Sequence, residues 1–130
     1  MAKHNEIGKL GEEIAMKFLM KQNFSFVEKN FSCHLGEIDL IFKEKDILRF
    51  IEVKSIATSR GIYDLSLLQV QPEENLSRDK WNKILKSIDV YKKTKSISQE
   101  TAWFIDLLCV FIDTDTREAK IRWIKHITFN

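Results

Sequence analysis

Two apolar segments joined by a short charged turn, GEIDLIFKEKDILRFIEVKS at residues 36–55, predict two adjacent β-strands. We expect these strands at 37–43 and 47–55. Four charged residues interrupt the apolar runs: Glu37, Asp39, Glu52 and Lys54. Burying a charge is costly unless the group is paired or binds a metal, so these residues need an explanation beyond solubility.

The turn sets the register of the two strands. A tight hairpin centred on Lys45 and Asp46 would place Asp39 opposite Glu52. Glu52 and Lys54 are two residues apart, so on a strand their side chains project to the same face, about 7 Å apart. A cross-strand salt bridge with Lys54 would account for one acid and leave the other carboxylates unexplained.

Helical and strand patterns continue on either side of this hairpin. In the first strand, Phe24 and Phe26 are expected to point inward, with Val27 as a further candidate. Ser77 is a good N-cap for a second helix. The order α-β-β-β-α-β-β predicts an α+β fold with helices packed on a central mixed sheet. The expected elements are a helix over 6–22, strands over 24–31, 37–43 and 47–55, a helix from 77 to about 93, and strands over 101–113 and 120–129.

Composition excludes several classes of protein. With 130 residues, 44% hydrophobic and 31% charged, the chain suits one globular domain over residues 1–130 rather than a disordered chain. It has no apolar run near the roughly 20 residues that span a bilayer and no apolar signal-peptide core, so we expect a cytoplasmic protein without a membrane partner. Two cysteines are too few for a disulfide framework, and Cys33-His34 lacks further ligands at zinc spacing. The net charge of +2 permits a nucleic-acid partner without arguing for one.

Asp39 is followed thirteen residues later by Glu52-Val53-Lys54, a combination suited to phosphodiester hydrolysis. That reaction brings an anionic nucleophile to an anionic phosphate. A Mg²⁺ ion held by one or two carboxylates neutralises the phosphate and lowers the pKa of a bound water. An amine at the same place can orient or deprotonate the water, or stabilise the transition state.

The same residues carry a resemblance to a known family. Asp39 with Glu52-Val53-Lys54 resembles the PD-(D/E)xK nuclease superfamily. More narrowly, the chain resembles the YraN-like family of small predicted endonucleases, which are similar in fold to archaeal Holliday-junction resolvases. The match is carried by LGEEIAMKFL at 10–19, GEIDLI at 36–41, FIEVKS at 50–55, LSRDKWNKIL at 76–85 and FIDLLCV at 104–110.

The resemblance implies a restriction-endonuclease-like core and a Mg²⁺- or Mn²⁺-dependent endonuclease with no small-molecule cofactor. Asp39, Glu52 and the carbonyl of Val53 would hold the metal ion. Lys54 would serve the attacking water or the transition state, and Glu12 would approach the same site from the first helix.

The resemblance also implies DNA as the partner, with branched or single-stranded forms favoured. Lys80 stands at the family's lysine in the basic helix, and Lys83 follows on that helix. Together with Arg60 from the loop after the third strand, they would contact the DNA backbone. Cutting both strands of a junction would require a homodimer with two sites.

Two positions depart from the family. Its usual Arg two residues after the motif lysine is Ile56 here, and its Arg before the late Asp strand is Phe104, which affects the expected DNA contacts more than the metal site. Arg60 is a candidate substitute. Two other functions therefore stay open: a nucleic-acid-binding module that keeps the nuclease fold without cleaving, and a protein-interaction domain whose charged cluster is structural.

Other residues have more than one interpretation. Asp106 interrupts an apolar strand and needs a partner, either Lys80 or a turn that it caps. Glu37 either supports the site from behind or pairs with a nearby backbone group or lysine. Gly8 and Gly11 weaken the first helix but would allow it to pack closely on the sheet.

Overall fold

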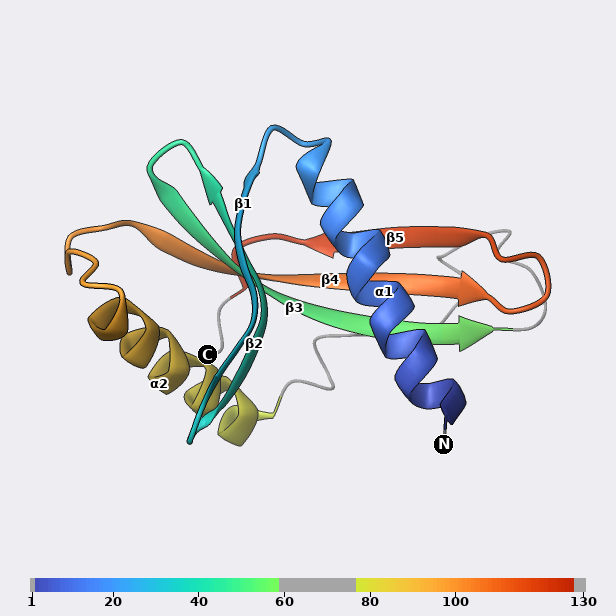
Figure 1. Ribbon diagram of the computed structural model, residues 1–130, viewed down its shortest axis with the longest axis horizontal. Coiled ribbons are helices and arrows are strands. Elements are labelled where there is room, and N and C mark those ends of the chain that lie inside the picture. The colour runs from blue at the N-terminus through green and yellow to red at the C-terminus, as the bar shows by residue number, and fades with distance from the viewer. Residues whose placement is uncertain (1, 59–76, 128–130) are drawn as a thin grey trace.

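The helices and strands follow one another in the order expected from the sequence (Figure 1). The structure is a computed structural model that describes the backbone of residues 2–58 and 77–127 and the side chains from residue 6 onward in those ranges. The elements are α1 (Ala2–Met20), β1 (Ser25–Cys33), β2 (Gly36–Glu44), β3 (Ile47–Thr58), α2 (Arg78–Thr94), β4 (Trp103–Asp113) and β5 (Ala119–Ile124).

The five strands form one sheet in the order β1-β2-β3-β4-β5. Neighbours are antiparallel except β3 and β4, which are parallel and have α2 between them in the chain. This mixed sheet with two helices confirms the α+β fold class and is consistent with a restriction-endonuclease-like arrangement. β4 lies between two other strands and is buried along most of its length, as its continuous apolar sequence predicts.

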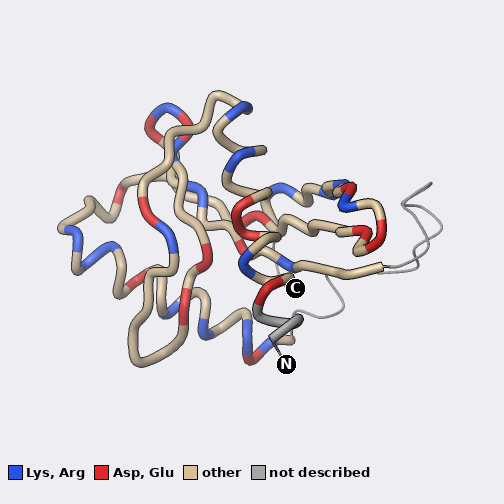
Figure 2. Tube along the Cα trace, turned by 45° about the vertical axis from the view of Figure 1, so that its right-hand side comes forward, with Lys and Arg blue, Asp and Glu red and all other residues tan. Residues whose placement is uncertain are grey.

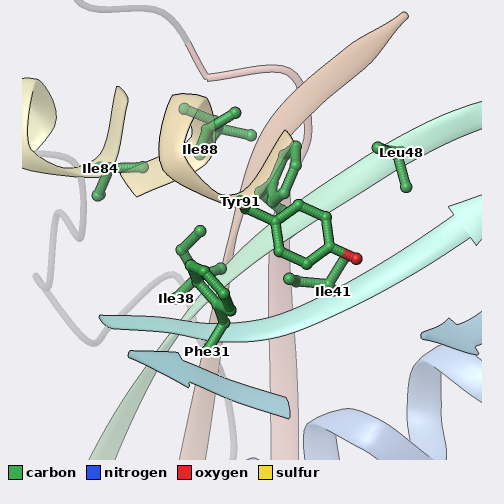
Figure 3. Packing of buried hydrophobic residues seen from close by; sticks show 9 residues of the cluster. Phe31, Ile38, Ile41, Leu48, Ile84, Ile88 and Tyr91 are labelled. Carbon is green, nitrogen blue, oxygen red and sulfur yellow. The ribbon is translucent and has the colours of Figure 1, made fainter. Parts of the chain in front are cut away.

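The two helices cover opposite faces of the sheet. Consecutive residues of β3 point to opposite sides of the sheet, and each side packs against a different helix. Phe50 packs edge-on against Tyr91 of α2, with ring centroids 5.7 Å apart. The next residue, Ile51, belongs to the core cluster under α1. Figure 3 shows Ile84, Ile88 and Tyr91 of α2 facing the strands. Burying a side chain of this size stabilises the fold by roughly 2 kcal/mol.

Gly11 lets α1 approach β3 closely. A Cβ at this position would overlap the Oγ and Cβ of Ser55 on β3. The close packing expected of the helix glycines is therefore present at Gly11. At Gly8, an added Cβ would meet no atom within 4 Å among the described residues, so packing does not explain that glycine.

A β-bulge in β1 corrects the expected inward side chains of that strand. Phe24 is buried as predicted, but Phe26 and Val27 are 41% and 40% exposed. The pairing of β1 with β2 shifts by one residue between Phe26 and Glu28, which breaks the alternation of inward and outward side chains. Beyond the bulge, Phe31 points into the core.

The ends of several elements also differ from expectation. α1 begins at Ala2 rather than at residue 6, since an apolar pattern marks only the packed part of a helix. β5 ends at Ile124, because His126 has a φ of 53° and its backbone N–H donates to Asp106 instead of continuing the ladder. β3 runs to Thr58, and the irregular strand expected after Arg60 lies outside the described residues.

Neither helix in the described part of the chain is long and apolar enough to cross a membrane.

Candidate functional site

A cleft of about 420 Å³ opens where β2 and β3 meet the N-terminal half of α1 and the first turn of α2. It contains all five residues expected at the catalytic or metal site: Glu12, Asp39, Glu52, Val53 and Lys54. Lys80 of α2 joins them. The lining is Ile7, Gly8, Glu12, Asp39, Glu52, Val53, Lys54, Ser55 and Lys80.

The β2–β3 hairpin brings the two motif halves together. Glu44 pairs with Ile47 and Leu40 with Ile51, which is the register expected from a turn at Lys45-Asp46. Just beyond the last of these pairs, the Asp39 carboxylate accepts a hydrogen bond from the backbone N–H of Val53 at 2.9 Å. That bond fixes Asp39 beside the Glu-Val-Lys strand.

Glu52 is a buried carboxylate with one oxygen unsatisfied. The residue is 9% exposed, and its Oε1 has no hydrogen-bond partner among the described residues. Its Oε2 lies 3.9 Å from the Nζ of Lys80. Burial, reinforced by the charge of Asp39, raises the pKa of Glu52 to about 8, even though Lys80 opposes the shift. At neutral pH this group therefore holds a proton unless a cation offsets its charge.

The neighbouring acids are shifted in the same direction. Burial is the main cause of the raised pKa of Asp39, and Glu37 adds to it. Burial and the charge of Asp39 raise the pKa of Glu12, which is half-buried at the cleft wall and not a solvated helix charge. Each of these three carboxyl groups, Glu12, Asp39 and Glu52, is therefore harder to ionise than a carboxyl group in water.

Asn30 is a residue of this cluster that sequence reasoning missed. With its side-chain nitrogen turned toward the acids, Asn30 donates to Glu12 Oε1 at 3.0 Å and to Glu37 Oε1 at 2.9 Å. Glu37 therefore accepts from an amide side chain, a partner not considered for it. No motif singles out Asn30, which reaches the acids because of the bulge in β1.

The cationic residues contribute unequally. Lys54 is exposed and lines the cleft, and Lys80 pairs with Glu52, one of the two roles considered for it. Lys83 lies outside the cleft lining and pairs with Asp79 at 3.3 Å. Arg60 lies outside the described residues.

The lysines of α2 form a weaker basic surface than the sequence suggests. Basic segments recur along α2 in Figure 2, but acidic segments are interspersed with them. Lys93 pairs with Asp89 at 3.0 Å and Lys95 with Glu28 at 3.3 Å. Lys92 is 5% exposed and is turned toward the carbonyl of Gln99.

The donor set suits a divalent cation only in part. Within the ranges that the structure describes, no three His, Cys, Asp or Glu side chains converge as a ready-made metal site. Asp39 and Glu52 nevertheless supply hard oxygen ligands, and the unsatisfied buried oxygen of Glu52 is what a cation would compensate. One or two carboxylates suffice for Mg²⁺ when water and substrate complete its shell.

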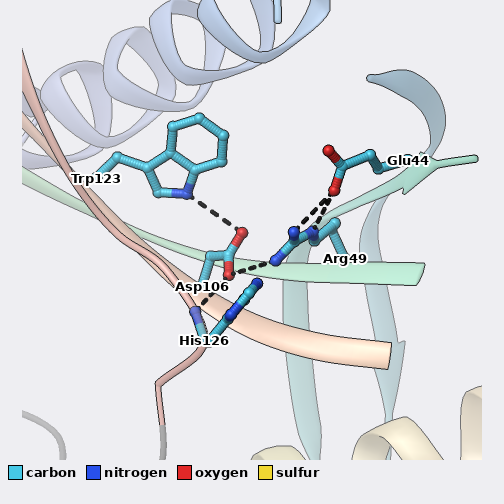
Figure 4. Close-up of polar contacts among 5 residues, drawn as sticks. All are labelled: Glu44, Arg49, Asp106, Trp123 and His126. Carbon is cyan, nitrogen blue, oxygen red and sulfur yellow. Dashed lines mark hydrogen bonds and ion pairs between the residues drawn. The ribbon is translucent and has the colours of Figure 1, made fainter. Parts of the chain in front are cut away.

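Asp106 belongs to a separate buried network, shown in Figure 4. It pairs with Arg49 at 3.3 Å and accepts hydrogen bonds from the Trp123 indole at 3.2 Å and the His126 backbone N–H at 2.9 Å. Arg49 also pairs with Glu44 at 2.8 Å. The expected contact of Asp106 with Lys80 is therefore wrong, whereas its bond to the backbone N–H of His126 caps the bend after β5, which was the other expected role. Asp106 ties β3, β4 and the end of β5 together.

The candidate residues fall in a segment shared with other proteins. The model of the uncharacterised protein family UPF0102 matches residues 11–113. The chain belongs to this family. A UPF0102 protein of Campylobacter jejuni (strain 81-176) is 39% identical over 122 residues, covering 94% of this chain and 93% of that protein. A UPF0102 protein of Clostridium botulinum (strain Kyoto) is 32% identical over 123 residues, covering 95% and 94%.

The UPF0102 match confirms the YraN-like family that the sequence motifs indicate. Its span from residue 11 to 113 includes every acid at the cleft and also Asp106.

Proposed function

We propose that this UPF0102 protein is a Mg²⁺- or Mn²⁺-dependent endonuclease that hydrolyses DNA phosphodiester bonds. The observation that carries the proposal is Glu52, a carboxylate buried beside Asp39 with one oxygen left without a hydrogen bond. A fold retains such a group when a ligand compensates it. A divalent cation fits two carboxylates better than any other small partner would.

Each cleft residue has a role in this reaction. Asp39, Glu52 and the carbonyl of Val53 hold the metal ion, which when bound neutralises the phosphate and acidifies a water molecule. Lys54, exposed in the cleft, orients the attacking water or stabilises the charge that builds on the phosphate. Glu12 completes the acidic wall from α1.

The remaining parts of the proposal concern substrate and context. We place the protein in the PD-(D/E)xK nuclease superfamily, acting on branched or single-stranded DNA in the cytoplasm. Lys80, Lys83 and Arg60 contact the DNA backbone. Lys80 has the best position for this, since it borders the cleft and its side chain is 56% exposed. A homodimer would supply the second site needed to cut both strands of a junction.

One observation favours the alternative of a nucleic-acid-binding module that does not cleave. In the described part of the chain, no three metal-ligating side chains converge, and the two arginine positions of the family hold Ile56 and Phe104. A module of this kind would bind DNA with a strong dependence on salt and without a need for divalent metal.

A cleavage assay separates these functions. Purified protein is incubated with labelled single-stranded, duplex, flapped and four-way-junction DNA in Mg²⁺, Mn²⁺ or EDTA. We expect metal-dependent cutting that is lost in Asp39→Asn and in Lys54→Ala, with both variants still folded by circular dichroism. The exposed Lys120→Ala variant on β5 is the control for a general loss of positive charge.

One result would contradict the proposed site and another the proposed activity. Cutting by Asp39→Asn at the parental rate would place the activity elsewhere or in a contaminant. Salt-sensitive binding of one DNA form, with no cutting in either metal, would favour the non-cleaving module.

A further inference from the structure

Asn30 is an exposed residue of β1 that lies beside three acids, Glu12, Glu37 and Asp39. It lies on β1 between Lys29 and Phe31, which pair with Leu40 and Ile38 of β2, so Asn30 stands next to Asp39 across the sheet. With its side-chain nitrogen turned toward the acids, its amide bridges Glu12 and Glu37. Glu12 lines the cleft and also a neighbouring hollow of about 180 Å³ to which Asn30 contributes.

An amide suits this position better than a carboxylate would. Glu12 is half-buried near Asp39 and Glu37, and burial together with these charges raises its pKa, so repulsion among the ionised acids would turn its side chain away from the cleft. A neutral NH₂ group donates two hydrogen bonds without adding charge. Hydrogen bonds to an ionised acceptor are roughly twice as strong as those between neutral groups.

A simpler reason for an asparagine must be set beside this one. Asn30 has a φ of 53°, in the left-handed region that asparagine, aspartate and glycine tolerate best. If the backbone alone selects the residue, aspartate and glycine would serve equally well.

We propose that Asn30 is a positioning residue that holds Glu12 at the cleft wall for metal binding, an inference that rests on the proposed function. Asn30 touches neither metal nor substrate. It acts through Glu12, and Glu37 anchors the other hydrogen bond of its amide. Glu12 is thereby added to the residues that hold the metal ion, and partners of this kind behind a metal ligand commonly change metal affinity by 10–100-fold.

The first test measures thermal unfolding in EDTA at pH 8. Asn30→Asp keeps the size and the left-handed tolerance of the residue but replaces the donor with a third negative group. We expect its Tm to fall by about 5 °C or more. The fall should become smaller in a Glu12→Gln/Glu37→Gln background, where Asp39 is the one of these three acids that remains beside residue 30. Asn23→Asp is the matched control, because Asn23 is exposed and has a φ of 63°.

The second test measures Mn²⁺ affinity by calorimetry. Asn30→Gly removes the amide, suits the positive φ and adds no charge. We expect it to bind Mn²⁺ about tenfold more weakly than the parent. Because Asn30 acts through Glu12, the double variant Asn30→Gly/Glu12→Gln should bind no more weakly than Glu12→Gln alone.

The two tests separate the positioning role of Asn30 from the proposed metal-dependent function. An Asn30→Asp variant as stable as Asn23→Asp would mean that the backbone alone selects the residue, and the inference would be wrong. Parental Mn²⁺ affinity in Asn30→Gly, or additive losses in the double variant, would also overturn it. If the parent binds no Mn²⁺, the proposed function and the positioning role fall together, while the unfolding data still report whether the Asn30 contacts exist.

Discussion

Glu52 shows how a single residue can be costly to the fold and useful to the site. Its carboxylate is nine-tenths buried with one oxygen unpaired, and Asp39 adds a second negative charge to the same cleft. In the absence of metal this arrangement costs stability whenever Glu52 is ionised. Functional residues commonly reduce the stability of the fold in this way.

Replacing Glu52 should therefore stabilise the metal-free protein at alkaline pH. Glu52 has a pKa of about 8 in the folded protein and 4.5 without perturbation. Its protonated form keeps its full contribution below about pH 4.5, and that contribution is lost as the pH rises toward 8. We expect Glu52→Gln to be more stable than the parent at pH 8 by a few kcal/mol, at about 1.4 kcal/mol per pKa unit, and no more stable at pH 4.5.

Urea unfolding in EDTA at pH 4.5, 6 and 8 would measure this difference. Glu100→Gln, at an exposed loop carboxylate, is the control for the loss of one negative charge. If the unfolding free energies of the parent and Glu52→Gln depend on pH in the same way, the pKa of Glu52 is not raised in the folded protein.

At the residue scale, sequence reasoning found the acids but not what holds them. Asp39 and Glu52 stand out because charges in apolar strands are rare. Asn30 does not, since without the bulge in β1 it would face Ile38 instead of Asp39. A one-residue shift of register moves a side chain to the other face, and nothing in the sequence around Phe26 announces it.

At the scale of elements, the contact between α1 and β3 sets one wall of the cleft. Glu12 can reach the cleft only if α1 lies close to β3, and Gly11 over Ser55 permits that approach. The helix itself was predictable from its apolar spacing. The closeness of the helix to the sheet was not predictable, because the sequence around a helical glycine is the same whether or not that glycine contacts a neighbouring strand.

Two glycine substitutions on this helix should have opposite effects. Gly11→Ala forces a Cβ into Ser55 and should lower the free energy of unfolding by about 1–3 kcal/mol. Gly8→Ala meets no described neighbour and should be neutral or stabilising by up to about 1 kcal/mol. Chemical denaturation of both variants tests the contact, and equal stability of the two would refute it.

The Asp106 network predicts a structural role for a charged residue that interrupts an apolar strand in the sequence. Arg49 is 5% exposed, so Asp106→Asn would leave its charge buried with Glu44 as its remaining ion-pair partner. We expect a loss of about 3 kcal/mol in unfolding free energy, with Mn²⁺ affinity of the folded protein unchanged. Asp46→Asn at the exposed hairpin turn is the control. A stable variant with impaired metal binding would show instead that Asp106 takes part in the metal site.

For the whole molecule, the fold separates stability from the site. The two core clusters and the Arg49–Asp106 network hold the sheet, while the acids gather where β3 passes between the N-terminal half of α1 and the first turn of α2. Element order, fold class and the β2–β3 register followed from periodicity and turn position. The meeting of both helices at one cleft depends on long-range packing, which local pattern does not encode.

The most direct measurement of the central claim is the shift of Tm caused by a divalent metal. The parent, Asp39→Asn and Glu52→Gln are unfolded by heat at pH 8 in EDTA and in millimolar Mg²⁺ or Mn²⁺. A ligand that binds only the folded state raises stability by about 2.7 kcal/mol at a hundredfold excess over its Kd. We predict a higher Tm with metal for the parent and little or no shift for either variant. An identical Tm with and without metal in the parent would show that these carboxylates are not gathered around a cation.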